Sequence, residues 1–488
     1  MTDSNHGSVP VRYFCTAGNG MESFLVEEVK RKVAAQDVIH LQGKVIFSSS
    51  ANINNIVNLK SAERLFLLLN HEAPIKLPAH INRAKASSLL QSYLTGDKNE
   101  VARVVMLWLS LQGALKDRST NYKVQPSATV GGKRGDNDEQ SLVIEDRYPG
   151  DSSRCKRQRL EYGNPDDTPM DQQDKLLPSV DSVTFRICCK CSGSLSRYFS
   201  TQDVSKVLGA SLTTLLGWRV DLKNPHLEVN VNLTDDYCLQ GIPLTKFPLA
   251  NRNYVQTTGL RSTVAWAMAS MAQIQPGSFV VDPMCGVGTI LIEAAKEHNG
   301  AFFLGIDNDD EQLVKANENI VYAHLEDRMQ VLKASSLVLP LHSASVDTVV
   351  CDLPFGRKFS TKIDAAKDLP PILYEMTRVL RVGGILVLLL SPQLSCLIKR
   401  LIAQEDVKSN STDSQTEKQD CLSDGATCTK QLLSEGQNNG PPSAQETKYG
   451  LKRTHPLSSL RHEKTVRVSL GAIDGLMHKY VKLDPCFK

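Results

Sequence analysis

The chain has 488 residues, of which 41% are hydrophobic, and its formal net charge is +3. This length predicts about two to four domains, and no apolar run is long enough to span a bilayer, which argues against a membrane protein. So small a net charge does not identify a nucleic-acid partner, and any basic surface must be local. The first residues, MTDSNHGS, do not resemble a signal peptide, so we expect an intracellular protein.

The twelve cysteines are scattered without paired spacing, which favours buried thiols in a reducing compartment over disulfides. Cys188, Cys189 and Cys191 fall in one predicted strand, where neighbouring side chains point to opposite faces. A structural zinc site normally uses two C-x2-4-C pairs. We therefore predict that the protein binds no metal.

Residues 10–115 are predicted to form an N-terminal α/β unit. The segments 12–15 and 43–49 are predicted strands, and a glycine turn leads from the first strand into a helix. Residues 61–69 fit either a strand or a helix, and the apolar pattern of 80–115 is helical. The order strand, helix, strand favours a ferredoxin-like unit, and the sequence leaves its strand pairing open.

Residues 116–178 are rich in Gly, Asp, Ser, Pro and Gln, and are too polar to bury a core. We predict that this segment is a disordered insert. It contains a basic cluster, which fits a nuclear-import signal or an RNA-contacting arm no better than it fits a solvated patch of a flexible linker. The cluster consists of Arg154, Lys156, Arg157 and Arg159.

Residues 179–246 are predicted to form a second folded unit. A strand over 182–193 is followed by an amphipathic helix over 201–216, which Gly217 closes. The sequence HLEVNVNL at 226–233 alternates apolar and polar residues as a half-buried strand does, and 237–244 is its returning partner.

Residues 251–488 are predicted to form the last domain, which is organised around the stretch 279–289. Here a buried strand ends at Asp282, and Gly286 and Gly288 turn the chain into a helix. A helix N-terminus at the carboxyl end of a parallel strand is where open α/β sheets bind nucleotide-like ligands. The dinucleotide-binding motif G-x-G-x-x-G requires a third glycine where this chain has Leu291. A nicotinamide or flavin cofactor is therefore disfavoured.

Two further strands of this domain end in acidic residues. The strand 301–307 ends at Asp307, which is placed to accept hydrogen bonds from ribose hydroxyls, and the strand 346–352 ends at Asp352. Three strands of one sheet therefore end in an aspartate, which favours a functional site over an ordinary α/β core. A second polar stretch, 404–463, is a predicted disordered insert, and 464–470 with 476–483 forms a predicted hairpin.

These motifs resemble those of a known family. DLPFG at 352–356 resembles the (D/N)PP(Y/F) signature of methyltransferases that modify exocyclic amino groups. With DPMCGVGT at 282–289 it is similar to S-adenosylmethionine-dependent N-methyltransferases. Together with RYFCTAG at 12–18, KSAERLF at 60–66 and the segment 185–231, it resembles the THUMP-domain guanine-N2 RNA methyltransferase family.

The resemblance implies an α/β fold with three folded parts. An α+β ferredoxin-like domain and a THUMP domain would precede a C-terminal Rossmann-like class I methyltransferase domain. The predicted C-terminal hairpin would complete the seven-stranded sheet of that last domain, with one antiparallel strand. The resemblance also implies that the N-terminal half is needed for RNA but not for the cofactor.

The resemblance further implies a catalytic motif at residues 352–355. Asp352 and the carbonyl of Leu353 would accept hydrogen bonds from the target amine, while Pro354 would fix the backbone. Phe355 would stack on the extruded base.

The implied cofactor is S-adenosylmethionine. In related enzymes the loop before the helix at 262–274 folds over it, so Arg261 would contact its carboxylate or else form a structural ion pair. Related folds often bind adenine with an acid where this chain has Ser335, which leaves that contact open. The predicted cofactor-binding residues are Arg261, Asp282, Met284, Cys285, Gly286, Gly288, Thr289, Asp307, Asn308 and Ser335.

RNA is the implied partner, either U6 small nuclear RNA or tRNA, and a small zinc-binding activator subunit is implied as well. We expect a nuclear or cytoplasmic location. Predicted phosphate contacts in the THUMP domain are Arg186, Lys190, Arg197, Lys206 and Arg219. The alternatives are a non-catalytic RNA-binding protein with a methyltransferase-like scaffold, or an enzyme that methylates an adenine or protein amide nitrogen.

Overall fold

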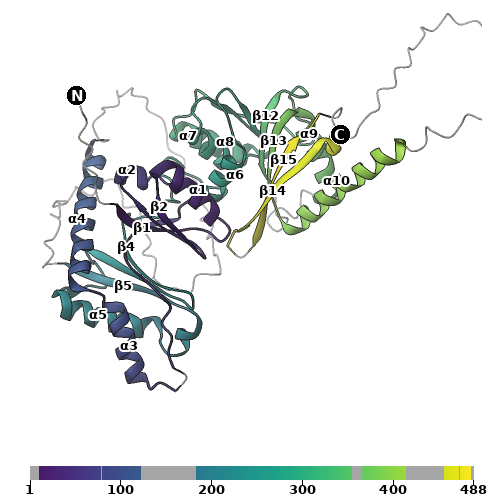
Figure 1. The fold of residues 1–488 in the computed structure, drawn as a ribbon. Helices are drawn as coiled ribbons and strands as arrows, with labels where there is room; N and C mark the ends of the chain where they lie inside the picture. The colour runs from purple at the N-terminus through teal and green to yellow at the C-terminus, as the bar shows by residue number, and fades with distance from the viewer. Residues whose placement is uncertain are drawn as a thin grey trace, which may run out of the picture.

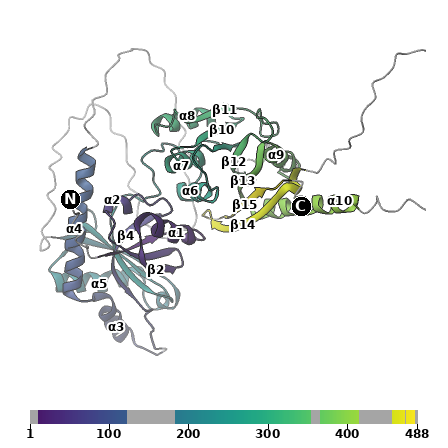
Figure 2. The ribbon, with the colours of Figure 1, turned by 45° about the horizontal axis from the view of Figure 1, so that its top comes forward.

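The computed structural model describes residues 10–78, 80–121, 183–353, 365–413, 456–471 and 473–484. They form two packed units, one built around an eight-stranded sheet and the other around a seven-stranded sheet (Figure 1 and Figure 2). None of the helices in these ranges combines the length and hydropathy needed to cross a membrane. The basic cluster at 154–159 lies outside the described residues.

The first six elements form the expected ferredoxin-like unit, with antiparallel strands in the order β2-β3-β1-β4. The segment that fitted a strand or a helix belongs to strand β4. Strand β2 was not predicted, because it lies at the sheet edge and its pattern QDVIHL lacks regular apolar alternation. The elements are β1 (Val11–Thr16), α1 (Glu22–Val33), β2 (Gln36–Leu41), β3 (Lys44–Ser49), α2 (Ile53–Ile56) and β4 (Arg64–Glu72).

The next elements continue the same sheet. Strand β8 pairs antiparallel with β4, so the units predicted at 10–115 and 179–246 share one sheet of order β2-β3-β1-β4-β8-β7-β5-β6. This pairing covers an edge of β4 that would otherwise be exposed. The elements are α3 (Arg83–Thr95), α4 (Lys98–Asn121), β5 (Thr184–Cys191), η2 (Gly193–Arg197), α5 (Thr201–Leu216), β6 (Arg219–Val220), β7 (Leu227–Leu233) and β8 (Cys238–Pro243).

The C-terminal unit has the predicted seven-stranded sheet, of order β11-β10-β9-β12-β13-β15-β14. Strand β15 is antiparallel to both of its neighbours and the other pairs are parallel, which confirms one antiparallel strand. The elements are α6 (Ser262–Met271), β9 (Phe279–Asp282), α7 (Thr289–Glu297), β10 (Phe302–Asp307), α8 (Asp310–Tyr322), β11 (Met329–Lys333), β12 (Val346–Asp352), α9 (Ala365–Val379), β13 (Leu380–Leu390), α10 (Pro392–Asp413), η3 (Pro456–Ser459), β14 (Leu460–Ser469) and β15 (Asp474–Lys482).

Helices cover both faces of this sheet, as a mainly parallel sheet requires. Successive strand residues point to opposite layers: Val280 packs with α6 and α7, and Val281 packs with α9 and α10. The unit therefore has two apolar layers, and the carboxyl ends of its parallel strands meet at one edge.

Both predicted inserts are shorter than the sequence pattern indicates. Helix α4 runs to Asn121, past the predicted insert start at 116, and α10 runs to Asp413, past 404. Strand β14 begins at Leu460, before the predicted end at 463. Polar residues on the exposed side of a helix or edge strand have the same composition as a linker, so composition alone misplaces these boundaries. Apart from η3 at Pro456–Ser459, the remainder of both inserts lies outside the described residues.

Apolar side chains at the start of α1 and directly before it join the two units. Met21 and Phe24 are buried in the core that α6 and α7 form beneath the second sheet. Beside them Gly20 has a φ of +85°, and an added Cβ there would lie 1.8 Å from the carbonyl oxygen of Arg467 on β14. The first unit is therefore packed closely against the second.

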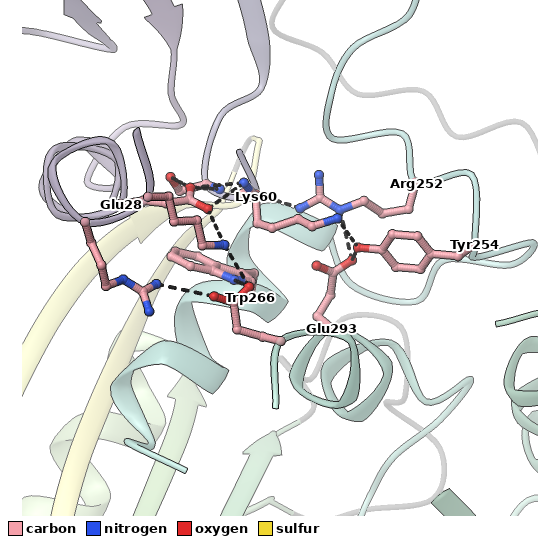
Figure 3. Close-up of polar contacts among 10 residues, drawn as sticks. Glu28, Lys60, Arg252, Tyr254, Trp266 and Glu293 are labelled. Atoms are coloured by element: carbon pink, nitrogen blue, oxygen red, sulfur yellow. Dashed lines mark hydrogen bonds and ion pairs between the residues drawn. The ribbon is translucent and has the colours of Figure 1, made fainter. Parts of the chain in front are cut away.

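A buried polar network lies at the same junction (Figure 3). The Glu28 carboxylate on α1 accepts hydrogen bonds from the backbone N–H of Lys60 at 2.8 and 3.0 Å. The segment between β8 and α6 joins the two units, and we call it the connector. Its residue Arg252 donates to the Lys60 carbonyl at 2.6 Å and to Glu293 Oε1 on α7 at 2.9 Å. Tyr254 also donates to Glu293 Oε1, at 3.0 Å. The network thus links α1, the connector and α7.

Candidate active site

The predicted strand, glycine turn and helix are confirmed at β9 and α7. Gly286 and Gly288 have φ values of +51° and +81°, in the left-handed region that favours glycine. The N–H of Gly288 donates to the Cys285 carbonyl at 2.8 Å, which closes the turn. The first N–H groups of α7 have no partner within the helix and are directed at the turn, so this loop suits an anionic or hydrogen-bond-accepting ligand.

Three carboxylates end neighbouring strands at this edge. Asp282 ends β9, which lies between β10, ending at Asp307, and β12, ending at Asp352. Asp307 accepts the N–H of Gly286 at 2.9 Å through Oδ2, so it also holds the glycine turn. Asp282 accepts the N–H of Met284 at 3.1 Å. The sequence correctly placed the three acids together.

Burial raises the pKa of two of these acids. It raises the pKa of Asp282 to about 8, and the negative charges of Asp352 and Asp307 contribute in the same direction. It also raises the pKa of Asp352 to about 7. Within the described part of the chain, Asp352 Oδ1 is buried and has no hydrogen-bond partner. A buried acceptor without a partner is costly, and a donor from a ligand would remove that cost.

The other predicted cofactor residues lie along the same edge. Met284 and Cys285 form the turn after β9, and Thr289 begins α7, where its Oγ1 accepts the N–H of Gly259 at 3.1 Å. Asn308 and Ser335 are exposed and follow the adjacent strands β10 and β11. Their contacts with a cofactor remain predictions.

Arg261 forms the structural ion pair that the sequence offered as one of its two roles, and its contact with the cofactor carboxylate remains a prediction. It lies directly before α6 and forms an ion pair with Glu63 of the N-terminal unit, in which Nε donates to Oε1 at 2.6 Å. Thr263 donates to the same Glu63 oxygen at 2.7 Å. Arg261 therefore belongs to the junction between the units as well as to the loop beside α7.

The predicted catalytic motif is only partly described. Leu353 is buried, and its N–H donates to the Leu389 carbonyl at 3.1 Å, which continues the ladder between β12 and β13. Pro354 and Phe355 lie outside the described residues.

Asn319 on α8 is a structural residue of the site that sequence reasoning missed. Its side chain is fully buried, and Oδ1 accepts the N–H groups of Gln256 and Thr257, both at 3.0 Å. Its Nδ2 donates to the carbonyls of Thr257 at 2.8 Å and Val287 at 3.0 Å. It therefore fastens the connector to the glycine turn. The available signal was its position three residues after Ala316, on the apolar side of the predicted helix.

Comparison with known proteins gives the family. The RMKL-like methyltransferase domain model matches residues 250–418, and the THUMP domain model matches 171–240. U6 snRNA (guanine-N(2))-methyltransferase THUMPD2 of Bos taurus is 37% identical over 98% of this chain and 97% of that protein. The tRNA (guanine(6)-N(2))-methyltransferase THUMP3 of Bos taurus is 26% identical over 82% and 84%.

The fold also matches a solved structure. The crystal structure of TrmN from Thermus thermophilus superposes with a TM-score of 0.58 and 17% identity, over 97% of this chain and 100% of that chain. This likeness shows the shared fold. Since a relative with 37% identity spans nearly the whole sequence, the chain belongs to the THUMP-domain guanine-N2 RNA methyltransferases.

Proposed function

We propose that this protein transfers the methyl group of S-adenosylmethionine to N2 of a guanosine in U6 small nuclear RNA. The choice of RNA is supported by the greater identity to the relative named for U6 snRNA than to the one named for tRNA. The chemistry is supported by Asp352, which ends the strand next to the glycine turn and whose buried Oδ1 has no hydrogen-bond partner among the described residues.

The site suits methylation of an exocyclic amine. S-adenosylmethionine would supply an electrophilic methyl group on a sulfonium ion. Asp307 and the N-terminus of α7 offer a hydrogen-bond acceptor and N–H donors for its polar groups. The amine of guanine is a poor nucleophile, because its lone pair is delocalised into the ring. Asp352 would accept an N–H hydrogen bond from that amine and so favour a pyramidal nitrogen whose lone pair is localised.

The remaining contributions are proximity and orientation. Pro354 would fix the backbone beside the amine, and Phe355 would stack on the extruded base. Following the family, we include a small zinc-binding activator subunit as a partner and a nuclear location, since the proposed substrate is a small nuclear RNA.

A direct assay tests this function. The purified protein, supplied with the activator subunit and S-adenosylmethionine, should form N2-methylguanosine in a U6 small nuclear RNA transcript. Mass spectrometry of the digested RNA identifies the product and its position. Methylation of a tRNA transcript alone would overturn the proposed substrate, and methylation of adenine would overturn the proposed acceptor.

Asp307→Ala should weaken cofactor binding. The change removes an acceptor for ribose hydroxyls and releases the N–H of Gly286. Hydrogen bonds to a charged acceptor contribute about 1.5–3 kcal/mol, so affinity should fall roughly ten- to hundredfold. Calorimetric titration with S-adenosylhomocysteine measures this. Asp310→Ala is the control, because Asp310 is exposed and pairs with Lys333. Unchanged affinity in Asp307→Ala would contradict the cofactor assignment.

A further inference from the structure

Glu63 is an acidic residue of the N-terminal unit that reaches the start of the second unit. It is buried and lies directly before β4. Its N–H donates to the carbonyl of Thr16 on β1 at 2.8 Å, and its own carbonyl accepts the N–H of Ala250 in the connector at 3.4 Å. The backbone of Glu63 is therefore held by the first sheet on one side and by the connector on the other.

The Glu63 carboxylate accepts three hydrogen bonds from residues at the start of α6. Arg261 donates through Nε to Oε1 at 2.6 Å and through Nη2 to Oε2, and Thr263 donates to Oε1 at 2.7 Å. Two parallel bonds between a guanidinium and a carboxylate fix the orientation of the guanidinium as well as its position. The side chain of Glu63 is 10% exposed and that of Arg261 is 60% exposed. A buried acid therefore orients an arginine that lies at the surface.

The end of the connector lies on the glycine turn. Residues 256–259 are exposed and belong to no helix or strand. Gly259 donates to Thr289 Oγ1 at 3.1 Å, and an added Cβ at Gly259 would lie 3.0 Å from Cγ2 of Val287. Asn319 accepts two further N–H groups of this segment. Because the segment has no helical or strand hydrogen bonds of its own, these contacts and the ion pair of Arg261 set its position.

Arg261 has the chemistry to bind the amino-acid end of the cofactor. S-adenosylmethionine carries a carboxylate at that end, and a guanidinium is well suited to bind a carboxylate. A guanidinium has five N–H donors, so the pair with Glu63 does not exhaust them. Gly259, which contacts the first residue of α7, is only two residues before Arg261. The ion pair therefore holds the arginine close to the glycine turn.

We propose that Glu63 is a positioning residue for cofactor binding, which orients Arg261 toward the cofactor carboxylate and holds residues 256–261 beside the glycine turn. The inference rests on the proposed function, since it uses the cofactor site proposed there. It gives Arg261 both of the roles that the sequence offered, because the ion pair places the arginine for the second contact. It also gives the N-terminal unit a part in the cofactor site. The expectation that this half is needed for RNA but not for the cofactor is the alternative that the experiment tests.

Calorimetric titration of Glu63→Gln with two ligands tests the proposal. S-adenosylhomocysteine has the carboxylate of the cofactor, whereas 5′-methylthioadenosine keeps the adenosine and the sulfur but lacks the amino-acid part. The variant should bind S-adenosylhomocysteine about tenfold more weakly than wild type, the effect of one weakened charge-assisted hydrogen bond. Its affinity for 5′-methylthioadenosine should be unchanged, because this ligand has no carboxylate for Arg261. A pair that only stabilises the fold would not distinguish the two ligands.

Glu297→Gln is the matched control. Glu297 ends α7 and pairs with Arg31 and Lys32 on α1, so this change also removes a charged pair between the units but leaves the connector in place. Both ligands should bind it as they bind the wild-type protein. In an Arg261→Gln background, Glu63→Gln should cause no further loss of affinity, because Glu63 acts through Arg261.

Three results would overturn the proposal. They are equal weakening of both ligands by Glu63→Gln, wild-type affinity of that variant for S-adenosylhomocysteine, and additive losses in the double variant. The first would make the pair with Arg261 purely structural. Methylation of the U6 small nuclear RNA transcript by the wild-type protein is scored separately, so failure of the proposed function is distinguishable from failure of the role of Glu63.

Discussion

Asp352→Ala should reduce methyl transfer by about 10²- to 10³-fold while cofactor affinity stays within about twofold of wild type. The loss has the size expected when a preorganised polar group is removed from a transition state. The cofactor should be unaffected, because Asp307 and the glycine turn form its proposed site. Single-turnover assays with the activator subunit measure the transfer step, and titration with S-adenosylhomocysteine measures affinity. Wild-type turnover in this variant would rule out the proposed mechanism.

Asp352→Asn separates charge from geometry. The amide keeps an acceptor oxygen and the shape of the side chain but has no negative charge. If the hydrogen bond alone favours a pyramidal nitrogen, the Asn variant should retain measurable activity. If the negative charge stabilises the transition state, it should behave as the Ala variant does.

The raised pKa of Asp352 adds a pH dependence to the same experiment. Its pKa of about 7 means that the carboxyl is largely protonated below pH 7 and largely ionised above it. Since the ionised form is the better acceptor, the wild-type rate should rise as pH increases through about 7. The Asn variant has no titrating group at this position, so its rate should lack that rise. Parallel pH profiles for the two proteins would contradict the role of Asp352.

The sequence predicted the residues that lie where periodic elements end. Asp282, Asp307 and Asp352 each follow a buried apolar strand, and parallel strands bring their carboxyl ends to one edge. The C-terminal hairpin was also predictable, because each of its two strands has a local alternating pattern that the preceding long insert does not alter. Such features depend on local sequence and on the rules of sheet topology.

The features that sequence reasoning missed depend on contacts between distant segments. The sequence offered an ion pair for Arg261 but could not name Glu63 as its partner, because no local pattern connects these residues. The pairing of β8 with β4 likewise merges two predicted domains into one sheet. Met21 and Phe24 have the pattern of ordinary core residues, but the core they enter belongs to the other unit. The expectation that the N-terminal half is unnecessary for the cofactor stays a prediction, although a fragment beginning near residue 247 would lack the two side chains that fill that core.

Glu293→Ala should destabilise the protein by about 3–5 kcal/mol, because it leaves the buried guanidinium of Arg252 without its carboxylate partner. The side chains of Arg252 and Glu293 are 3% and 0% exposed, so both charged groups are removed from solvent. Tyr254 loses its acceptor as well. These residues link the connector to α7, which begins at the glycine turn. The substitution should therefore also make the glycine turn less rigid and weaken cofactor binding. Thermal unfolding followed by fluorimetry measures the stability, with and without S-adenosylhomocysteine.

The control for this change is Glu100→Ala, which breaks the ion pair with Arg103 on the exposed surface of α4. Exposed pairs contribute about 0–1 kcal/mol, so this variant should unfold close to the wild-type temperature. Glu293→Gln keeps the shape of the side chain and one acceptor oxygen, and should fall between the two, since only the charge is lost. Equal stability of Glu293→Ala and Glu100→Ala would mean that the junction network contributes no more than a surface pair. The two units would then be held together mainly by the apolar contacts of Met21 and Phe24 and by the pairing of Glu63 with Arg261 and Thr263.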